Sequence, residues 1–553
     1  MAIRFRTPTH VLTDGSNLAG DGDLLGAAQV GGNDKFLGES GAPNGYTAFG
    51  DARTMSGHAK GGSDYLKAGD NVHGVNFSGD GGDLQEFALG GNDTLLGGEN
   101  STFQFFGDAS GSMSGQARGG NDSIVGSSAY GNDGYSVIQG IAFGDSLNQY
   151  GASHGGADFL SAGAVTADPG GSLFVLNEFA GDSYNMYDSS TGGNDKLIGG
   201  TTSAYESGQA MSLNVFCGDG YHMNDGTTGG NDTLVGGNAY HGDSSSGQAV
   251  ALNILSGDGY TAWGGVKFGA DVITGGSGTG DHVSVLNVIF GDALGYTPYN
   301  NDASPHSLSG DALAAAVSSF SAENAGGGLP TFADMVAAVN HQLSMSSDPL
   351  LSTSTANPVV MFGNDKLFGG AQNAQNVLYG DTSHIYANGY GGNDTLIGGG
   401  AGTTNILVGD ADNIDAGGFG GKDRLVSGEG NDEMWGDAKV NMLGMGGADT
   451  FVFARNNGND VIHDFQVGVD HIDLSAFLNV RGMSHTFSAL VSSGRLQNVN
   501  NPAVGANEQI NSGNVILHLD ADPASNHNTV LILGVTLDQL SGSSFIFFAV
   551  PGI

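Results

Sequence analysis

The sequence predicts an all-β chain: a parallel β-roll or β-solenoid of stacked Gly/Asp-rich coils, with a small inserted helical hairpin and a C-terminal β cap. Two observations predict it: a glycine count of 99 in 553 residues, against about 7% in ordinary domains, and two motifs that alternate along the chain. Self-similarity at a fixed period is typical of solenoids, whose repeats bury their apolar faces only against their neighbours.

The first motif is Gly-Gly-Asn-Asp followed by an apolar triplet, with Asn replaced by Ser, Ala or Lys in some copies. Its aspartates are Asp34, Asp64, Asp93, Asp122, Asp158, Asp195, Asp232, Asp271, Asp365, Asp394, Asp423 and Asp449. The second motif is an aromatic or aliphatic residue that leads into Gly-Asp. Its aspartates are Asp51, Asp80, Asp108, Asp145, Asp182, Asp219, Asp258, Asp292, Asp381, Asp410 and Asp437.

The spacing between the motifs predicts stacked coils. The step from Gly-Asp to the next Gly-Gly-Asn-Asp is 13 residues in eight of eleven cases, whereas the return step varies from 14 to 26. A fixed step beside a variable one indicates that one side of each coil is locked in register while the other carries loops. Short strands are expected at Asp-x-Leu-x-Gly-Gly (for example 93–98) and before Gly-Asp, as in Leu213–Phe216.

Five segments follow from the repeats. Residues 1–30 hold an N-terminal segment and the first partial coil, 31–292 and 363–445 are solenoid, 293–362 are the helical insertion, and 446–553 are a C-terminal cap and secretion module. In the insertion two helical patterns are expected, one with Leu313, Val317 and Phe320 on a face, the other with Phe332, Val336, Val339 and Leu343. Thr331 and Asp334 fit a capping box.

An asparagine recurs five residues before the Gly-Asp aspartate in six copies. These are Asn177, Asn214, Asn253, Asn287, Asn376 and Asn405. Identical residues at identical offsets in stacked coils form a ladder of amide hydrogen bonds, so we interpret the asparagines as structural.

Charge and cysteine content exclude several classes of function. The net charge is −41, which excludes nucleic acid and anionic membranes as direct partners because both are polyanions. The single Cys217 excludes a disulfide framework and a Cys-rich metal site; it fills a position held by Ala180 and Ser256 in neighbouring copies and is interpreted as packing. The N-terminus lacks an apolar signal-peptide core, and no stretch of about 18 apolar residues predicts membrane insertion.

Gly-rich turns that end in Asp suit a hard cation. We expect Ca²⁺, because it takes six to eight oxygen ligands, with glycines in positive-φ turns directing carbonyls inward. Ordinary Asp/Asn-Gly turns without metal are the alternative. A dozen copies on so acidic a chain favour the metal, since carboxylates stacked about 4.8 Å apart repel unless they are neutralised.

Several segments resemble the nonapeptide Gly-Gly-x-Gly-x-Asp-x-apolar-x of the RTX, or hemolysin-type, calcium-binding proteins. They are GYGGNDTL (389–396), GFGGKDRL (418–425), SGEGNDEM (427–434) and GMGGADTF (444–451). Asp423 and Asp432 are nine residues apart, and the stretch 446–477 is similar to the C-terminal module of serralysin-like, type I secreted proteases. The ending 537–547 is similar to their uncleaved secretion signals.

The resemblance implies several Ca²⁺ ions bound between turns and export by type I secretion machinery, with folding triggered by calcium. The metal ligands expected first are Asp394, Asp423, Asp432 and Asp449, followed by the other aspartates of the first motif, with carbonyls of glycines such as Gly391, Gly420 and Gly446 completing the shell.

No enzyme motif has a convincing context. The zinc-protease pattern His-Glu-x-x-His is absent from the sequence, and the only Gly-x-Ser-x-Gly (151–155) runs directly into a repeat, so we interpret it as a turn. Paired carboxylates for glycoside chemistry stay open, because sequence spacing gives no separation in space. We expect a non-enzymatic chain.

The sequence therefore predicts an extracellular or cell-surface protein, exported without an N-terminal signal peptide, with a structural role such as a filament, surface layer or biofilm matrix. Repeats begin almost at once, leaving no N-terminal cap, so we expect self-association through an open solenoid edge. The alternative is a carbohydrate-binding adhesin or polysaccharide-modifying enzyme, with surface polysaccharide as partner.

Overall fold

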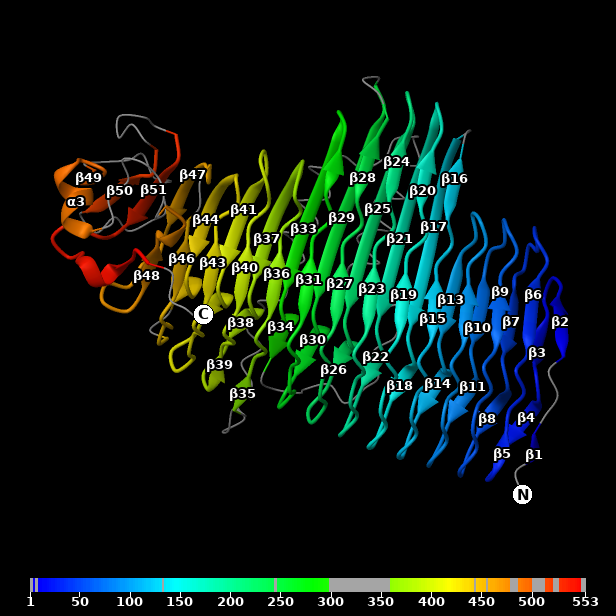
Figure 1. The fold of residues 1–553 in the computed structure, drawn as a ribbon. Coiled ribbons are helices and arrows are strands. Elements are labelled where there is room, and N and C mark those ends of the chain that lie inside the picture. Colours follow the sequence, from blue (N-terminus) through cyan, green and yellow to red (C-terminus); the bar gives the residue numbers. More distant parts are fainter. Residues whose placement is uncertain are drawn as a thin grey trace. The chain divides into compact units, whose positions relative to one another are not determined.

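The computed structural model describes residues 3–4, 8–131, 134–242, 246–297, 359–441, 444–453, 456–477, 486–499, 513–520 and 527–548. The chain divides into two compact units, one of Met1–Leu286 with Asp292–Pro358, the other of Asn287–Gly291 with Val359–Ile553. In both units parallel strands from successive coils stack into sheets (Figure 1), which confirms the predicted β-solenoid. Among the described helices, none is long and apolar enough to cross a membrane.

Each coil of the first unit supplies one short strand to sheet I, one strand to sheet II and one to sheet III. Sheet I has the order β2 (Thr9–Leu12), β6 (Lys35–Gly38), β9 (Tyr65–Lys67), β12 (Thr94–Leu96), β15 (Ser123–Val125), β19 (Phe159–Ser161), β23 (Lys196–Ile198), β27 (Thr233–Val235) and β31 (Val272–Thr274). Its strands are the predicted apolar triplets after Gly-Gly-Asn-Asp.

Sheet II contains the strands that lead into Gly-Asp. In the first unit its order is β3 (Asn17–Ala19), β7 (Tyr46–Phe49), β10 (Val75–Ser78), β13 (Phe103–Phe106), β17 (Gly134–Phe143), β21 (Gly171–Ala180), β25 (Gln209–Cys217), β29 (Gln248–Ser256) and β33 (Val283–Phe290). Sheet III follows Gly-Asp. Its order is β4 (Gly22–Leu25), β8 (Ala52–Met55), β11 (Gly81–Leu84), β14 (Ala109–Met113), β18 (Ser146–Gln149), β22 (Ser183–Met186), β26 (Gly220–Met223), β30 (Gly259–Trp263) and β34 (Ala293–Thr297).

The longer coils owe their length to a fourth sheet. Sheet IV consists of β16 (Ala129–Gly131), β20 (Val165–Ala167), β24 (Thr202–Ala204), β28 (Ala239–His241) and β32 (Gly278–Thr279). In the same coils the sheet II strands lengthen, as in the ten residues of β21. The variable return step of the sequence is therefore strand, not loop, because both added stretches pair in register with their neighbours.

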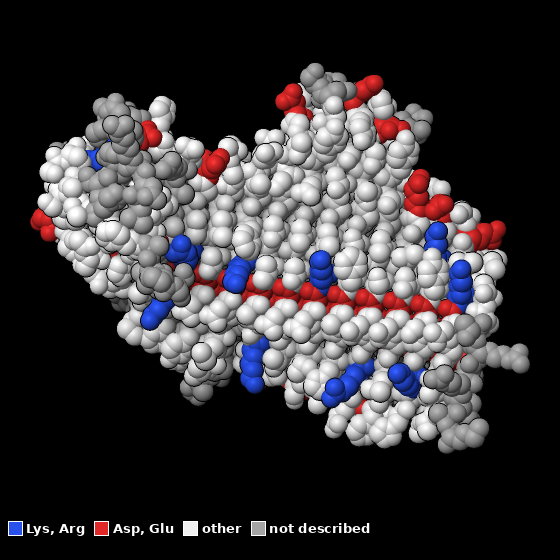
Figure 2. All heavy atoms as spheres, in the orientation of Figure 1, with Lys and Arg blue, Asp and Glu red and all other residues white. Residues whose placement is uncertain are grey.

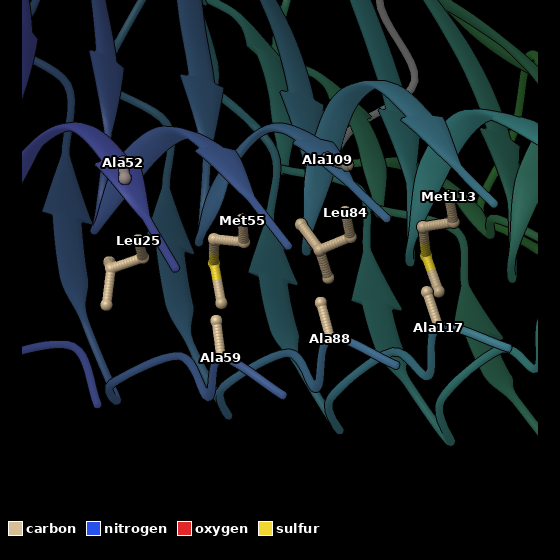
Figure 3. Packing of buried hydrophobic residues seen from close by; sticks show 9 residues of the cluster. All are labelled: Leu25, Ala52, Met55, Ala59, Leu84, Ala88, Ala109, Met113 and Ala117. Atoms are coloured by element: carbon tan, nitrogen blue, oxygen red, sulfur yellow. The ribbon is translucent and has the colours of Figure 1, made fainter. Parts of the chain in front are cut away.

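The core of the coils is built from identical positions one coil apart. At the ends of the sheet III strands, Leu25, Met55, Leu84 and Met113 stack with small Ala residues such as Ala59 (Figure 3), and all are fully buried. In-register stacking fixes the hydrophobic set of each strand on one face, since a slip of one residue would turn it to solvent.

The second unit continues the same coil plan and ends in a different arrangement. Its sheet I strands are β36 (Lys366–Phe368), β40 (Thr395–Ile397), β43 (Arg424–Val426), β46 (Thr450–Val452), β48 (His471–Asp473) and β52 (Phe545–Ile546). Its sheet III strands are β38 (Thr382–Ile385), β42 (Ala411–Ile414) and β45 (Ala438–Asn441). Its sheet II strands are β37 (Ala374–Tyr379), β41 (Thr404–Val408), β44 (Asn431–Trp435) and β47 (Asn459–Ile462), followed by β51 (Thr529–Leu533), β50 (Asn514–His518) and β49 (Leu496–Asn498). The pairing β51–β50–β49 is antiparallel, and α3 (Phe487–Ser492) lies in the same region.

Two further pairs of β-strands are short, with two residues in each strand. β1 (Ile3–Arg4) pairs with β5 (Gln29–Val30), and β35 (Val360–Met361) with β39 (Gly389–Tyr390). The ends of the predicted insertion 293–362 are strands β34 and β35. Its helical patterns and the capping box fall in residues 298–358, outside the described residues.

Candidate metal centre

The Gly-Gly-Asn-Asp aspartates form one continuous line in each unit, here called the first acid column. The backbone N–H of each donates to the carboxylate of the aspartate one coil further along the chain: Asp93 N–H reaches Asp122 Oδ1 over 2.6 Å, and Asp195 N–H reaches Asp232 Oδ1 over 2.6 Å. In the second unit Asp394 N–H reaches Asp423 Oδ1 over 2.8 Å. All are almost fully buried. Figure 2 shows acidic side chains as a straight red row across successive coils.

The Gly-Asp aspartates form a second acid column beside the first. Each accepts a hydrogen bond from the second glycine of the following Gly-Gly-Asn-Asp, as in Gly193 N–H to Asp182 Oδ1 (2.9 Å) and Gly230 N–H to Asp219 Oδ1 (2.7 Å). This bond connects each Gly-Asp motif to the Gly-Gly-Asn-Asp motif that follows it. It therefore explains why the spacing between the two aspartates is constant at 13 residues. The second column is also buried.

Glycines line both columns because no side chain fits there. A β-carbon on Gly192 would lie 1.7 Å from Asp219 Oδ1, and one on Gly391 would lie 1.8 Å from Asp410 Oδ1. Gly420 and Gly446 likewise lie against Asp437. The expectation of positive φ was wrong for this motif: its described glycines do not adopt the left-handed region, and steric space is what requires them.

Carbonyl oxygens of glycines and carboxylate oxygens of aspartates meet along the columns. Next to the α-carbon of Gly50 lie both the carbonyl oxygen of Gly79 and Asp64 Oδ2, and the same pairing recurs next to Gly380, where Gly409 O meets Asp394 Oδ2. At the first coil, oxygens of Asp21, Asp34 and Asp51 all lie within 4.8 Å of one another.

Ten described first-column carboxylates keep an oxygen without a protein donor. Among the described residues, no hydrogen bond reaches the buried Oδ2 atoms of Asp34, Asp64, Asp93, Asp122, Asp158, Asp195, Asp232, Asp394, Asp423 and Asp449. A buried carboxylate oxygen without a donor is costly unless a cation neutralises it.

The electrostatics of the columns disfavour ionised carboxylates. Burial, followed by the charges of Asp93 and Asp51, raises the pKa of Asp64 to about 11. Burial also raises the pKa of Asp51 and of Asp394 to about 8, and burial with the charges of Asp437 and Asp470 raises the pKa of Asp449 to about 9. Without a counter-cation these side chains hold protons at neutral pH.

Asp432, expected among the first calcium ligands, lies in neither acid column. The structure places it in the asparagine ladder, where Asn405 Nδ2 donates to its Oδ1 over 2.5 Å and Gly428 N–H donates to its Oδ2 over 2.8 Å. The ladder itself is confirmed: Asn177 donates to Asn214 and Asn214 to Asn253, both over 2.9 Å, and Asn287 donates to Asn376 over 2.7 Å. Cys217 is buried, as expected.

The second acid column was not among the residues expected to hold metal. The signal was present in the sequence, because its aspartates alternate strictly with the first motif at the fixed 13-residue step. The first column also ends on an aspartate outside both motifs, since Asp449 N–H donates to Asp470 Oδ1 over 3.0 Å.

The comparisons with known proteins concern the last coils and the cap. Residues 385–546 match a family model, the peptidase M10 serralysin C terminal. The match begins at the end of β38 and includes Asp394, Asp423 and Asp449 of the first column. It supports the expected serralysin-like module, and the matched residues include coils as well as residues 446–546. No curated protein and no solved structure matches the chain.

The residues that match the family model use the same acid columns as the coils that lie outside the match. Gly421 N–H donates to Asp410 Oδ1 over 2.6 Å inside the module, as Gly230 N–H does to Asp219 far outside it. The local geometry of the carboxylates is therefore the same in matched and unmatched coils.

Proposed function

We propose that this protein is an extracellular calcium-binding β-solenoid whose fold is completed by Ca²⁺ ions bound along the two acid columns. One observation carries the proposal: in coil after coil a buried carboxylate oxygen faces a glycine carbonyl and a second carboxylate, with no protein donor on it. Bound Ca²⁺ would supply the positive charge that lets these carboxylates ionise inside the protein.

The donor set fits Ca²⁺ better than other common metals. Its atoms are carboxylate and carbonyl oxygens, which hard cations prefer, whereas zinc and copper sites use His or Cys. Ca²⁺ also tolerates irregular shells of six to eight oxygens, while Mg²⁺ requires near-octahedral geometry. Asp64 Oδ2, Gly79 O and the neighbouring Asp51 and Asp80 carboxylates would hold one such ion.

The serralysin C-terminal module supports an extracellular location reached by type I secretion, in agreement with the resemblance of residues 537–547 to secretion signals. Extracellular fluid supplies Ca²⁺ at levels that suit weak sites. The resemblance then implies a chain that stays unfolded during export, because its stacked carboxylates repel until the metal is bound.

A structural, self-assembling role is the function we propose for the folded scaffold. The columns repeat the same contacts in every coil, which suits metal binding better than catalysis at one place. At the first coil, Val11 and Leu24 are 65% and 60% exposed on strands β2 and β4, and apolar side chains on open edge strands favour pairing with another chain. The proposed partner is a second copy, in a filament, surface layer or biofilm matrix.

A glycan-binding role is the second candidate, favoured by one groove in the second unit. It lies on the outer face of sheet II and is lined by a polar row, Gln375, Thr404, Asn431 and Asn459, beside Val377 and Ile406. Rows of amides and hydroxyls are suited to sugar hydroxyls, and Trp435 lies close by in β44. Binding of the folded chain on a glycan array, lost in the Asn431→Ala variant, would favour it.

Calcium titration into EDTA-treated full-length protein tests the leading proposal. We expect far-UV circular dichroism to show cooperative gain of β-structure, calorimetry to show binding of several ions, and light scattering to show growth of the particles afterwards. A protein already folded in EDTA, with no heat of calcium binding, would contradict the metal role. Folding without growth would leave the metal role and remove self-assembly.

A further inference from the structure

Sheet IV, which only the longest coils possess, has a regular row of hydroxyl groups on its outer face (Figure 1). Side chains alternate along its strands: Ala129, Val165 and Ala239 are buried, and the next residue of each strand faces outward. Strand pairing places the outward residues in one register column through five coils. They are Tyr130, Thr166, Ser203, Tyr240 and Thr279, here called the hydroxyl row.

The hydroxyl row is not a general property of the coils. In sheet I the corresponding outward column mixes polar, basic and apolar side chains. Its members over the same part of the chain are Ser123, Phe159, Lys196, Thr233 and Val272. Neither column lies in the core, so packing requires a hydroxyl in neither. The repeated hydroxyl in sheet IV therefore indicates a role toward something outside the coil.

Three tyrosine rings are exposed beside this row. Tyr130 and Tyr240 belong to it and are 44% and 37% exposed, and Tyr205, directly after β24, is 42% exposed. The rings of Tyr205 and Tyr240 lie 6.3 Å apart between centroids at an angle of 66°. Tyr130 Oη donates a hydrogen bond to the carboxylate of Asp168, which follows β20. Contacts between neighbouring coils therefore hold all three rings at the surface.

The outer face of sheet IV has no positive charge to offer a ligand. The residue two positions before each member of the hydroxyl row also lies on the outside. These residues are Ser128, Ala164, Thr201, Asn238 and Ser277. None of the outward residues in the two columns is Lys or Arg, and Asp168 adds a negative charge. Since anionic polymers are recognised by Arg and Lys, this face suits a neutral ligand.

We propose that the hydroxyl row, with Tyr130, Tyr205 and Tyr240, binds a neutral linear polysaccharide that runs along the stacked coils. Neighbouring strands are spaced about 4.8 Å apart, which is close to the length of one sugar ring, so successive sugars meet the same group in successive coils. Hydroxyls of protein and sugar can each donate and accept hydrogen bonds. The faces of tyrosine rings pack against the apolar C–H faces of sugars, while the phenol stays hydrated.

The regularity of the row favours a polymer over a folded protein as the partner. A linear polysaccharide presents the same groups at a constant interval, whereas the surface of a folded protein does not repeat at the spacing of the coils. The buried centres of protein interfaces are also more apolar than this row. The inference gives the glycan-binding candidate a surface in the first unit, and it rests neither on the groove of the second unit nor on the calcium ligands.

Affinity electrophoresis of the calcium-loaded, full-length protein tests the ligand class. The gels contain hydroxyethyl cellulose, mixed-linkage β-glucan or galactomannan, which are neutral, or carboxymethyl cellulose, which is acidic. We expect at least one neutral polymer to retard the protein, and carboxymethyl cellulose to leave its mobility unchanged. Absence of retardation by every neutral polymer, or stronger retardation by the acidic one, would overturn the proposal.

A pair of hydroxyl variants tests the row itself. Thr166→Val with Ser203→Ala removes two half-buried hydroxyls from sheet IV, and Ser123→Ala with Thr233→Val removes the same two groups from half-buried outward positions of sheet I. We expect the first pair to weaken binding of the retarding polymer at least about fivefold, through the loss of two hydrogen bonds, and the control to stay within about twofold of wild type. Equal effects of the two pairs would contradict a role for the row.

The tyrosines are tested by Tyr205→Ala with Tyr240→Ala, which we expect to weaken binding at least about fivefold, as truncation of interface anchors usually does. Tyr390→Ala is the control, because Tyr390 is 39% exposed and stacks on Phe419 in the second unit. Melting temperatures in calcium separate loss of binding from loss of the fold. Binding that is lost in Asn431→Ala, and kept in the sheet IV variants, would assign the polysaccharide to the groove of the second unit and overturn this proposal.

Discussion

The backbone N–H of Asp93 donates to Oδ1 of Asp122, an aspartate 29 residues later, over 2.6 Å. The bond uses one oxygen of the carboxylate to fix the stacking of two coils, and it leaves Oδ2 of Asp122 for a cation. Coil stacking and the proposed metal binding therefore depend on the same side chain. A variant that tests metal binding alone must keep the acceptor Oδ1 and change Oδ2. Asp→Asn is such a change, since the amide keeps an acceptor oxygen.

The pH dependence of stability is expected to reverse with calcium. Burial holds the folded-state pKa of Asp51 and Asp394 at about 8, above the value of about 4 in the unfolded chain. In EDTA, stability is therefore fully present below pH 4 and is lost as pH rises toward 8, because the unfolded chain releases the protons first. Far-UV circular dichroism in EDTA at pH 4.5 and 8 measures this as the folded fraction; a larger folded fraction at pH 8 would contradict it.

With calcium the sign changes, since Ca²⁺ binds the ionised carboxylates and displaces their protons. We expect calcium-loaded protein to be more stable at pH 8 than at pH 4.5, and calcium binding in weakly buffered solution at pH 4.5, where the folded metal-free protein holds protons on its columns, to release protons. Calorimetry in two buffers of different ionisation enthalpy measures the proton count. No difference between the buffers would show that the columns are already ionised before the metal binds.

Asp195→Asn is expected to weaken calcium binding while keeping the hydrogen bond that Asp158 N–H donates to Oδ1 of residue 195 in the first acid column. The variant removes one charge and one carboxylate ligand from the first column, so it should need a higher Ca²⁺ concentration to fold and should melt lower than the wild type in calcium. Asp188→Asn is the matched control, because exposed Asp188 also accepts a backbone N–H from the preceding coil, that of Gly151. Equal calcium affinity for Asp195→Asn and the control would remove Asp195 from the ligands.

Gly192→Ala is expected to destabilise the solenoid by about 1–3 kcal/mol, the usual cost of overpacking a buried site. The new methyl would lie 1.7 Å from Asp219 Oδ1 and 2.4 Å from Asp182 Oδ2, so the second column must shift. Urea unfolding in saturating calcium measures the change. Gly26→Ala is the control, since its nearest contact would be Gln29 Oε1 at 3.4 Å; similar losses in the two variants would exclude a role for the columns.

Asn214→Ala is expected to cost about 1–3 kcal/mol for each buried group it leaves without a partner. Asn214 accepts from Asn177 and donates to Asn253 within the interior of the coils. Exposed Asn231, which bonds to Asn194 at the surface, is the matched position, and its Ala variant should lose well under 1 kcal/mol. Chemical denaturation in calcium distinguishes them.

Changes at the first coil are expected to prevent particle growth without unfolding the protein. Val11→Lys with Leu24→Lys places charges on the open edge, a device that keeps edge strands from pairing. Leu89→Lys is the control, because its neighbours in the same column are Lys60 and Arg118. Light scattering in millimolar calcium should show growth for the control only; growth of both variants would place the self-contact elsewhere.

The fold could be predicted because the length of each coil determines the spacing of the motifs in the sequence. Asp64 and Asp93, for example, recur at the offset at which their coils stack. The second column could have been included among the candidate ligands from the same arithmetic, since Asp51 and Asp80 occupy equally regular positions. Asp432 shows the limit of a local motif: it fits the nonapeptide, yet its coil register places it opposite Asn405.

The N–H to carboxylate bonds of the first acid column also give each unit a direction. Every donor N–H precedes its acceptor carboxylate in the sequence, so the first coil presents the acceptors of Asp34, whose oxygens receive no hydrogen bond from the described residues. Two copies related by a two-fold axis at this edge would bring carboxylates against carboxylates, whereas a translated copy can bring donors to acceptors. Assembly through this edge, if the proposed self-contact forms there, would use heterologous contacts, which produce a closed ring or an open filament.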